Sequence, residues 1–369
     1  MDGNPNHTKA HIFIVNDERV HREEIRLVLA SLFRVSAFDS NAAAFDAMLT
    51  ERPDLVIVDE RMLKGGKGCL FDKRKHADLK SLPFIVSGHD SAQQYLSGEG
   101  AQADSLLIRP FSKNAILIQV SDALSYGFEQ KWQNLPELEK TALQSTLDEF
   151  QGISKAIQEG RPLDLEEASK SCAPLVQSIN DQSFHGILDN IRGHHNYTYV
   201  HSLRVATYLS IFGHAIGIRD DDLLTLATGG LLHDVGKMVT PQEVLNKSSK
   251  LDDNEWLCMK QHVENSSKVY DEMPDITHGI RIIGEQHHEK LDGSGYPLGL
   301  KGKQLNELAR MSAIVDIFGA LTDERSYKPA FPPEMAFDIL SEMTNQLDQR
   351  LVNIFREVLE GHGELPAQT

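Results

Sequence analysis

The dipeptide His233-Asp234, within the segment GGLLHDVGK, is the part of this sequence best suited to chemistry. Adjacent imidazole and carboxylate groups can serve two metal ions at once, because the imidazole binds one ion while the carboxylate bridges both. The pair alone is a weak signal, but further nitrogen and oxygen ligands lie in apolar or helix-like segments of the same part of the chain. These further candidates are His201, His262, His287, His288 and Asp316. Together the residues predict a metal centre.

Two metal ions at such a centre would suit the hydrolysis of a phosphodiester. The charge of a phosphodiester repels hydroxide, whereas two ions neutralise that charge, lower the pKa of a bridging water and stabilise the leaving oxygen. Lys237 follows Asp234 by one helical turn and can therefore reach the same phosphate. Mixed histidine and carboxylate ligands accept Fe, Mn, Zn, Ni or Co, so the residue types predict two divalent transition-metal ions without identifying them.

The first 125 or so residues alternate short apolar runs with helix-like segments. The apolar runs are 11–15, 55–58, 83–87 and 105–108, and the helix-like segments are 21–33, 41–50, 91–98 and 112–125. Continuous apolar runs are typical of strands that are buried on both faces. Their alternation with helices predicts an α/β doubly wound domain, with a parallel sheet covered by helices on both sides.

Polar residues follow the predicted strands, and parallel sheets place their sites at the carboxyl ends of strands. The residues at these ends are Asn16, Asp17, Asp59, Ser87 and Arg109. Two carboxylates, Asp17 and Asp59, suit Mg²⁺, which is a hard cation that prefers oxygen ligands. A phosphoryl group on Asp59 would need a hydroxyl donor and a cation nearby, which Ser87 and Arg109 could supply.

The strand signal vanishes over residues 126–175, which we interpret as a helical linker that is interrupted at 159–164. Four apolar residues fall at helical spacing here: Leu143, Leu147, Phe150 and Ile157. This face fits either a connecting helix packed on a neighbour or a dimerising helix with a coiled-coil-like seam. We expect a homodimer through the linker helix. From about residue 176 the pattern is helical, apart from the glycine-rich loop 292–302.

Composition narrows the classes of function. At 369 residues the chain suggests two or three domains, and its net charge of −17 argues against non-specific nucleic-acid binding, which needs basic surface. Cys69, Cys172 and Cys258 are isolated, which fits a reducing compartment. The N-terminus has no apolar signal segment, and no apolar run is long enough to span a bilayer. We therefore expect a soluble cytoplasmic protein without membrane insertion and without a nucleic-acid partner.

The segments IVNDE, LVIVDERM, IVSG and IRPF resemble the receiver domain of two-component response regulators, over residues 9–125. The resemblance implies a sensor histidine kinase as partner, phosphorylation at Asp59, and Mg²⁺ in the pocket. The sequence departs from the usual receiver pattern at Asn16, where an acidic residue is usual, and at Arg109, where lysine is usual. Arginine keeps the charge but not the compact ammonium geometry. The alternative is a receiver fold that no longer accepts phosphate.

The segments HDVGK, HHEKLDGSGYP and DERSYKP resemble the HD-GYP subgroup of the HD superfamily, over residues 176–365. The resemblance implies an all-α metal-dependent phosphodiesterase that opens cyclic di-GMP to linear pGpG and continues in some members to GMP. By analogy one metal ion is assigned the ligands His201, His233, Asp234 and Asp316. Asp234 then bridges to a second ion held by His262, His287 and His288, and both Asp234 and Lys237 act in catalysis.

The same resemblance implies how the cyclic dinucleotide is bound. The expected substrate contacts are Lys237, Gly295, Tyr296, Pro297, Arg325 and Lys328. Glycines in the loop let its backbone approach a ligand closely and adopt positive φ. Arginine suits phosphates and guanine edges through its planar fork.

Two positions depart from the HD-GYP pattern. Gly319 replaces the second aspartate of the motif D-x-x-D-A-L, which would orient a neighbouring ligand, so its loss loosens that orientation. Tyr197 stands where some members carry a glutamate for a third metal ion, and a phenol is neutral at pH 7, so we expect two ions. Two other classes of function stay open: a non-catalytic module that binds the dinucleotide and signals through partners, and a phosphohydrolase for another nucleotide.

Overall fold

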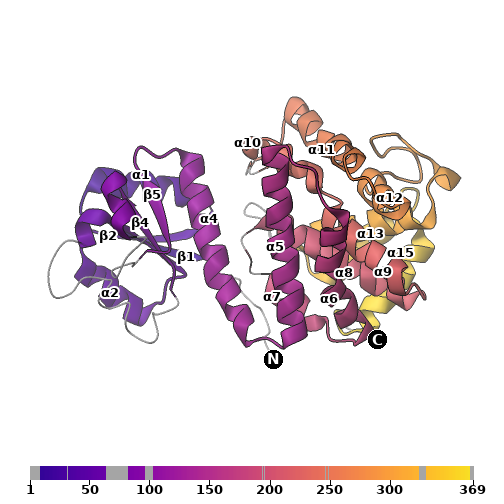
Figure 1. Ribbon diagram of the computed structural model, residues 1–369, viewed down its shortest axis with the longest axis horizontal. Helices are drawn as coiled ribbons and strands as arrows, with labels where there is room; N and C mark the ends of the chain where they lie inside the picture. Colours follow the sequence, from indigo (N-terminus) through magenta and orange to yellow (C-terminus); the bar gives the residue numbers. More distant parts are fainter. Residues whose placement is uncertain are drawn as a thin grey trace. The chain divides into compact units, whose positions relative to one another are not determined.

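The chain forms two compact units in the computed structural model (Figure 1), which describes residues 9–30, 32–63, 82–95, 103–192, 194, 196–245, 247, 249–323 and 330–365. The first unit comprises 1–133 together with 194–196, and the second comprises 134–193 and 197–369. Among the described helices, none has both the length and the apolar character that crossing a membrane requires.

The first unit is built on a five-stranded parallel sheet with the strand order β2-β1-β3-β4-β5. The strands are β1 (His11–Val15), β2 (Arg34–Phe38), β3 (Leu55–Asp59), β4 (Phe84–Gly88) and β5 (Ser105–Ile108). The described helices of this unit are α1 (Arg19–Leu29), α2 (Asn41–Thr50) and α4 (Lys113–Glu129), with the 3₁₀ segments η1 (Glu60–Leu63), η3 (Asp90–Tyr95) and η4 (Gln130–Asn134). The expected α/β doubly wound class is confirmed.

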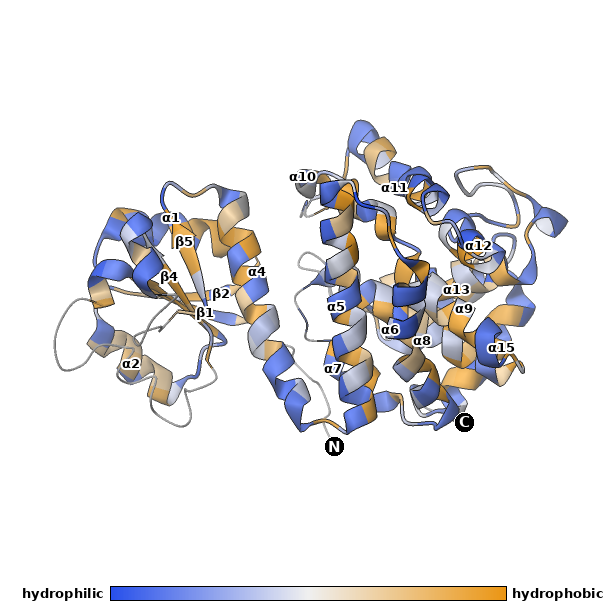
Figure 2. Ribbon diagram, in the orientation of Figure 1, coloured by the Kyte–Doolittle hydropathy of each residue, from blue (hydrophilic) through white to orange (hydrophobic). Residues whose placement is uncertain are grey.

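Alternate residues of the central strands bury their side chains on opposite faces of the sheet. Phe13 and Val58 pack in a core with α2, whereas Ile12 and Ile57 pack in a second core with α1 and α4. The helices therefore cover both faces, as Figure 1 shows, and the strands are coloured as hydrophobic in Figure 2. This burial on both sides explains why the strands are continuous apolar runs.

The sequence patterns missed β2, and they misplaced two helices. The strand has the sequence RVSAF at the edge of the sheet, where its residues are only partly buried, so no continuous apolar run marks it. The helix expected over 21–33 begins and ends earlier, as α1. The helix expected over 91–98 is the 3₁₀ segment η3 as far as Tyr95, and the rest lies outside the described residues.

The second unit is helical, and its described residues contain no β-strand, which confirms the expected all-α class. Its helices are α5 (Glu137–Glu159), α6 (Leu165–Asn180), α7 (His185–Ile191), α8 (Tyr197–Ala215), α9 (Asp220–Leu232), α10 (Gln242–Leu245), α11 (Asp253–Asp271), α12 (His278–Gln286), α13 (Glu307–Thr322), α14 (Pro333–Glu342) and α15 (Gln349–Gly361), with the 3₁₀ segments η5 (Val235–Val239) and η6 (Gly302–Gln304). Helix α8 is buried on all sides from Tyr199 to Gly213, so it forms the centre of this unit.

Most of the expected linker packs inside the second unit. Helix α5 ends at Gly160, which has a left-handed φ of 64°, and α6 follows after a short break, as the pattern at 159–164 indicated. Leu143, Leu147 and Phe150 are buried, and the Phe150 ring lies 5.6 Å from the ring of Tyr199 on α8. The apolar face of α5 therefore already has a partner within its own chain. Of the two alternatives for this face, the structure agrees with a connecting helix packed on a neighbour.

Candidate functional site

Seven candidate metal ligands from five parts of the second unit converge on one place. His201 lies on α8, His233 and Asp234 follow the end of α9, His262 lies on α11, His287 and His288 follow α12, and Asp316 lies on α13. All are buried except His288, whose side chain is 22% exposed. Residues up to 115 positions apart are thus brought together in a site shielded from water.

Asp234 lies between two groups of histidines. Its Oδ2 is 3.2 Å from Nε2 of His233 and 3.6 Å from Nε2 of His201. Its Oδ1 is 3.2 Å from Nε2 of His262 and 3.8 Å from Nε2 of His287. Because each carboxylate oxygen faces a different pair of imidazoles, this side chain has the position that a bridging ligand between two metal ions needs.

The ligand atoms fall into two clusters, in each of which all atoms lie within 4.8 Å of one another. One cluster is His201, His233 and Asp234, and the other is His262, His287 and His288. Asp316 contacts both, since its Oδ1 is 3.0 Å from His201 Nε2 and its Oδ2 is 3.5 Å from His288 Nδ1. Clusters of imidazole and carboxylate ligands suit transition metals, so the residues present fit two divalent ions.

Hydrogen bonds to carbonyl groups fix the orientation of three imidazoles. Nδ1 of His233 donates to the Gly230 carbonyl at 2.7 Å, and Nδ1 of His262 donates to the Met259 carbonyl at 2.7 Å. His287 donates in the same way to Gly284, at 2.9 Å. A carbonyl only accepts, so Nδ1 carries a hydrogen, and Nε2 is the nitrogen that can bind a metal ion in place of a proton.

The electrostatics of the centre favour cations. Burial alone would lower the pKa of His233, but Asp234 and Asp316 raise it to about 10. Burial would raise the pKa of Asp234, yet Lys237, whose ammonium group forms an ion pair with it, and His233 hold that pKa well below its usual range. Desolvation by the surrounding side chains lowers the pKa of the partly exposed His288 to about 3. The centre thus combines ionised carboxylates with imidazole ligands, and metal binding there competes with protons.

A glycine after the His-Asp pair lets η5 approach α11. A Cβ at Gly236 would lie 2.0 Å from the His262 carbonyl oxygen, so only glycine fits. The Gly236 amide also donates to Ser266 Oγ at 2.9 Å. This contact places His262 beside Asp234, although the two residues lie on different elements.

The glycine-rich loop folds back onto the histidine doublet. The Tyr296 amide donates to the His288 carbonyl at 3.2 Å, and the Tyr296 ring lies 4.7 Å from the ring of His288. A Cβ at Gly295 would lie 2.5 Å from the Glu289 Cα, so glycine is required for this close approach. The loop that contains Gly295, Tyr296 and Pro297 therefore borders the metal centre, whereas Arg325 and Lys328 lie outside the described residues.

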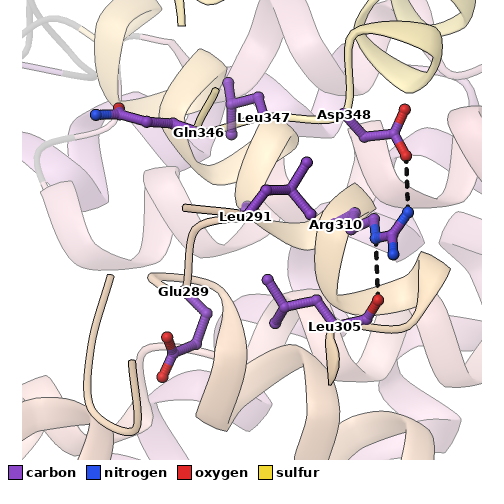
Figure 3. A pocket seen from close by; sticks show the side chains of 8 residues that line it. Glu289, Leu291, Leu305, Arg310, Gln346, Leu347 and Asp348 are labelled. Carbon is purple, nitrogen blue, oxygen red and sulfur yellow. Dashed lines mark hydrogen bonds and ion pairs between the residues drawn. The ribbon is translucent and has the colours of Figure 1, made fainter. Parts of the chain in front are cut away.

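Two residues that the sequence patterns missed hold this loop. Glu289, only 1% exposed, accepts hydrogen bonds from the amides of Leu298, Gly299 and Leu300 at 2.6–3.1 Å. Arg310 donates to the Gly302 carbonyl at the end of the loop at 3.1 Å. It also donates to the Leu305 carbonyl at 2.9 Å and pairs with Asp348 at 3.0 Å, as Figure 3 shows. The position of Glu289, directly after the ligand pair His287-His288, was the signal in the sequence that could have identified it.

The receiver pocket lies at the end of β3. Asp59 is buried and pairs in the sheet register with Ser87, whose buried hydroxyl has no hydrogen-bond partner among the described residues. Arg109 forms an ion pair with Asp59, and Nδ2 of Asn16 donates to Asp59 Oδ2 at 3.2 Å. The structure thus places three of the other expected residues, Asn16, Ser87 and Arg109, around the Asp59 carboxylate.

Arg61, which the sequence patterns missed, fills the acidic side of this pocket. Its Nε donates to Asp59 Oδ1 at 2.9 Å, its Nη2 lies 3.2 Å from Asp17 Oδ1, and its Nη1 lies 2.9 Å from Glu18 Oε2. Burial raises the pKa of Asp59, but the hydrogen bonds from Arg61 and Arg109 lower it below its usual value. One guanidinium thus contacts both carboxylates expected to hold Mg²⁺, and the pocket does not fit that ion in this arrangement.

Comparisons with known proteins agree with the two units. The model of the response regulator receiver domain matches residues 12–121, and the model of the HD domain matches residues 182–351. Among solved structures, Bd1817, an HDG"Y"P protein from Bdellovibrio bacteriovorus, is similar with a TM-score of 0.50 and 17% identity, over 70% of this chain and 89% of that one. This likeness supports the fold.

Curated relatives are phosphodiesterases of cyclic dinucleotides by name. The 3'3'-cGAMP-specific phosphodiesterase 3 of Vibrio cholerae is 28% identical over 72% of this chain and 60% of its own length. The cyclic di-GMP phosphodiesterase PA4108 of Pseudomonas aeruginosa is 32% identical over 46% of this chain and 40% of its own length. The chain therefore spans about half the length of these two relatives. The cyclic di-GMP phosphodiesterase response regulator RpfG of Xanthomonas campestris is 25% identical over 96% of this chain and 88% of its own length.

Proposed function

We propose that this chain, which belongs to the response regulators that join a receiver domain to an HD domain, hydrolyses cyclic di-GMP to linear pGpG, with GMP as the alternative final product. The observation that carries the proposal is the position of Asp234, whose two oxygens face two separate groups of histidines. The names of the relatives PA4108 and RpfG support cyclic di-GMP as the substrate. The receiver domain would control this activity.

The residues of the metal centre have distinct roles in this proposal. His201, His233 and Asp316 would hold one divalent ion, while His262, His287 and His288 would hold the other, with Asp234 shared between them. Two such ions, when bound, supply charge neutralisation and activation of water for attack on phosphorus. The surrounding burial excludes other water, which strengthens every interaction with the phosphate.

The chain's own groups would orient the dinucleotide at this centre. Lys237 lies next to Asp234, so its ammonium group can move from that carboxylate to a phosphate oxygen. Tyr296 offers an aromatic face beside His288 for a guanine base, on a loop that Glu289 holds in place. Arg325 and Lys328 stay proposed phosphate contacts outside the described residues.

A second cyclic dinucleotide is supported by the comparisons. Two relatives from Vibrio cholerae that are at least 30% identical over their matched residues are named as 3'3'-cGAMP-specific phosphodiesterases. Guanine and adenine differ in their hydrogen-bonding edges, so the two dinucleotides present different groups to the residues around Tyr296. Both dinucleotides therefore belong in any assay of turnover.

The receiver would pass a phosphorylation signal from a sensor histidine kinase through Asp59. Phosphoryl transfer with Mg²⁺ at Asp17 and Asp59 would require Arg61 to leave the pocket first, because it contacts both carboxylates. A homodimer through the linker helix also stays a proposal, and it would have to use a face other than the buried one with Leu143 and Leu147.

Anaerobic reconstitution of the full chain with Mn²⁺ or Fe²⁺, followed by chromatography of the nucleotide products, tests the function. We expect turnover of cyclic di-GMP, and its abolition in Asp234→Asn, which removes the charge of the bridge. The matched control is Asp221→Asn on the exposed start of α9, which should retain wild-type turnover. Protein that binds two metal ions yet turns over neither dinucleotide would instead support the non-catalytic binding module.

A further inference from the structure

His201 differs from the other three deeply buried histidines of the centre in the partner of its Nδ1. This nitrogen lies 2.7 Å from the Oδ2 of Asp323, whereas the others donate to backbone carbonyls. A carboxylate carries a full negative charge, so it polarises an imidazole more strongly than a carbonyl does. The opposite nitrogen, Nε2, faces Asp316 at 3.0 Å, so the charge acts on the atom that would bind metal.

Asp323 is itself held rigidly. It is 3% exposed, immediately follows the end of α13, and forms an ion pair with Arg204, which lies one helical turn after His201 on α8. Arg204 also donates to the Thr322 carbonyl at 3.1 Å and to the Tyr208 hydroxyl at 3.0 Å. A buried carboxylate with its charge paired and its position fixed can orient a ligand without being displaced by water.

The neighbouring turn of α13 brings Gly319 close to the same imidazole. Gly319 precedes Asp323 by one turn, and a Cβ at Gly319 would lie 3.4 Å from Cε1 and 3.5 Å from Nδ1 of His201. These are ordinary van der Waals contact distances, so a Cβ is tolerated at this position, on the side of α13 that faces the same imidazole.

We propose that Asp323 is a positioning residue for the metal centre, which takes over from position 319 the task of orienting His201. The sequence alone suggested that Gly319 loosens the orientation of a neighbouring ligand, without identifying that ligand. The geometry assigns a carboxylate that contacts His201 to the next turn of the chain. Asp323 contacts the far nitrogen of the ligand and touches neither substrate nor metal in this role. It fixes the tautomer of His201 and raises the basicity of Nε2. The proposal rests on the metal centre proposed above.

Metal titration of three full-length variants tests this role without any assay of turnover. We expect Asp323→Asn to lower the Mn²⁺ affinity of one of the two sites by about 10- to 100-fold and to leave the other site unchanged. Adding Gly319→Asp to that variant should restore most of the affinity, because the new carboxylate reaches the same nitrogen. Gly319→Asp alone should bind both ions as wild type does. Electron paramagnetic resonance of bound Mn²⁺, with competition by a chelator, resolves the two affinities.

The outcomes separate this inference from the proposed function. Wild-type protein that binds no divalent transition metal contradicts the metal centre itself. Two wild-type sites together with unchanged affinities in Asp323→Asn contradict the role of Asp323 alone. A loss in Asp323→Asn that Gly319→Asp fails to restore, in protein with wild-type circular dichroism, also overturns the proposal. If Asp323→Asn unfolds, Asp323→Glu tests the same contact. A crystal structure of this variant would show whether the longer side chain has moved away from His201. If it has, and both sites still bind metal with wild-type affinity, the role of Asp323 is contradicted.

Discussion

The receiver pocket and the HD centre both gather carboxylates, but different groups balance their charge. In the receiver, Asp59, Asp17 and Glu18 contact the guanidinium of Arg61, and Asp59 contacts Arg109 as well. In the HD centre, Asp234 and Asp316 face imidazoles, with Lys237 as the ammonium partner of Asp234. One pocket therefore carries its own fixed cations, and the other presents groups that can exchange a proton for a metal ion.

This difference decides which pocket is prepared for a metal. A guanidinium is charged at every physiological pH and offers no lone pair, so it competes with a cation and never binds one. An imidazole that loses its proton becomes a ligand. The HD centre should therefore bind its metals directly, whereas the receiver should bind Mg²⁺ only in exchange for Arg61.

The largest effect should follow from breaking the HD side of the comparison. His262→Ala removes a ligand whose Nε2 lies 3.2 Å from Asp234, so one metal ion should be lost. Since a metal ion contributes several kcal/mol to the transition state, we expect turnover to fall by about a thousandfold or more. Metal analysis should give one ion per chain in place of two.

The control for this experiment is His278→Ala, at the start of α12 and outside both metal clusters. It should keep two ions and wild-type turnover. Full turnover by His262→Ala at a measured content of one ion would mean that the second cluster is not part of the catalytic centre.

A smaller effect should follow from removing the fixed cation of the receiver. Arg61→Met abolishes the ion pairs to Asp17, Glu18 and Asp59 and leaves these carboxylates open to Mg²⁺. We expect acetyl phosphate with Mg²⁺ to label Asp59 about tenfold faster than in wild type, measured by mass spectrometry. Arg26→Met serves as the control, because Arg26 pairs with Glu23 on the surface of α1.

Equal labelling of wild type and Arg61→Met would show that Arg61 leaves the pocket freely. In that case the receiver would not differ from the HD centre in its readiness for a metal. No labelling of either protein, even at high Mg²⁺ concentration, would instead support the receiver that no longer accepts phosphate.

The sequence predicted the elements whose pattern is local and missed those whose role depends on a distant partner. Strands β1 and β3 were predictable because burial on both faces makes them uniformly apolar. Strand β2 was not, because an edge strand with partly exposed residues has no such run. Helix α5 was predicted as a helix, but its partners on α6 and α8 could not be identified from spacing alone.

The same limit applies to the site. The metal ligands could be found because histidine and aspartate in short motifs are chemically distinctive, as in the pair His233-Asp234. Arg61, Glu289 and Asp323 carry no such mark, since each is an ordinary charged residue whose function comes from what it touches. Charged side chains whose partners lie far away in sequence, such as Arg61 with Asp17 and Asp323 with His201, require a structure to be recognised.

A third group of carboxylates, Glu149 with Glu167 and Asp164, has its charge reduced by a proton on Glu149 instead of by a metal ion or an arginine. Burial first, and then the nearby charges of Glu167 and Asp164, raise the pKa of Glu149 on α5 from 4.5 to about 7. Because the folded pKa lies above the unfolded one, the folded state binds the proton more tightly. This stabilisation is fully present below about pH 4.5 and is lost as the pH rises through 7.

The smallest expected effect therefore concerns stability. The full shift would correspond to about 3 kcal/mol, but the side chain is partly exposed, and screening by water reduces this to about 1 kcal/mol. Glu149→Gln removes the ionisable group, so we expect it to raise the unfolding temperature by about 2–4 °C at pH 8 and to leave it unchanged at pH 5. Scanning calorimetry of both proteins at both pH values measures the difference, with Glu166→Gln on the exposed side of α6 as the control, which should shift neither value. A shift in unfolding temperature of equal size at pH 5 and pH 8 would show that packing of the amide, and not loss of the proton, explains the shift. Glu149 would then be ionised in the folded state. The contrast between a proton, an arginine and a metal ion as counter-charges would not extend to this group.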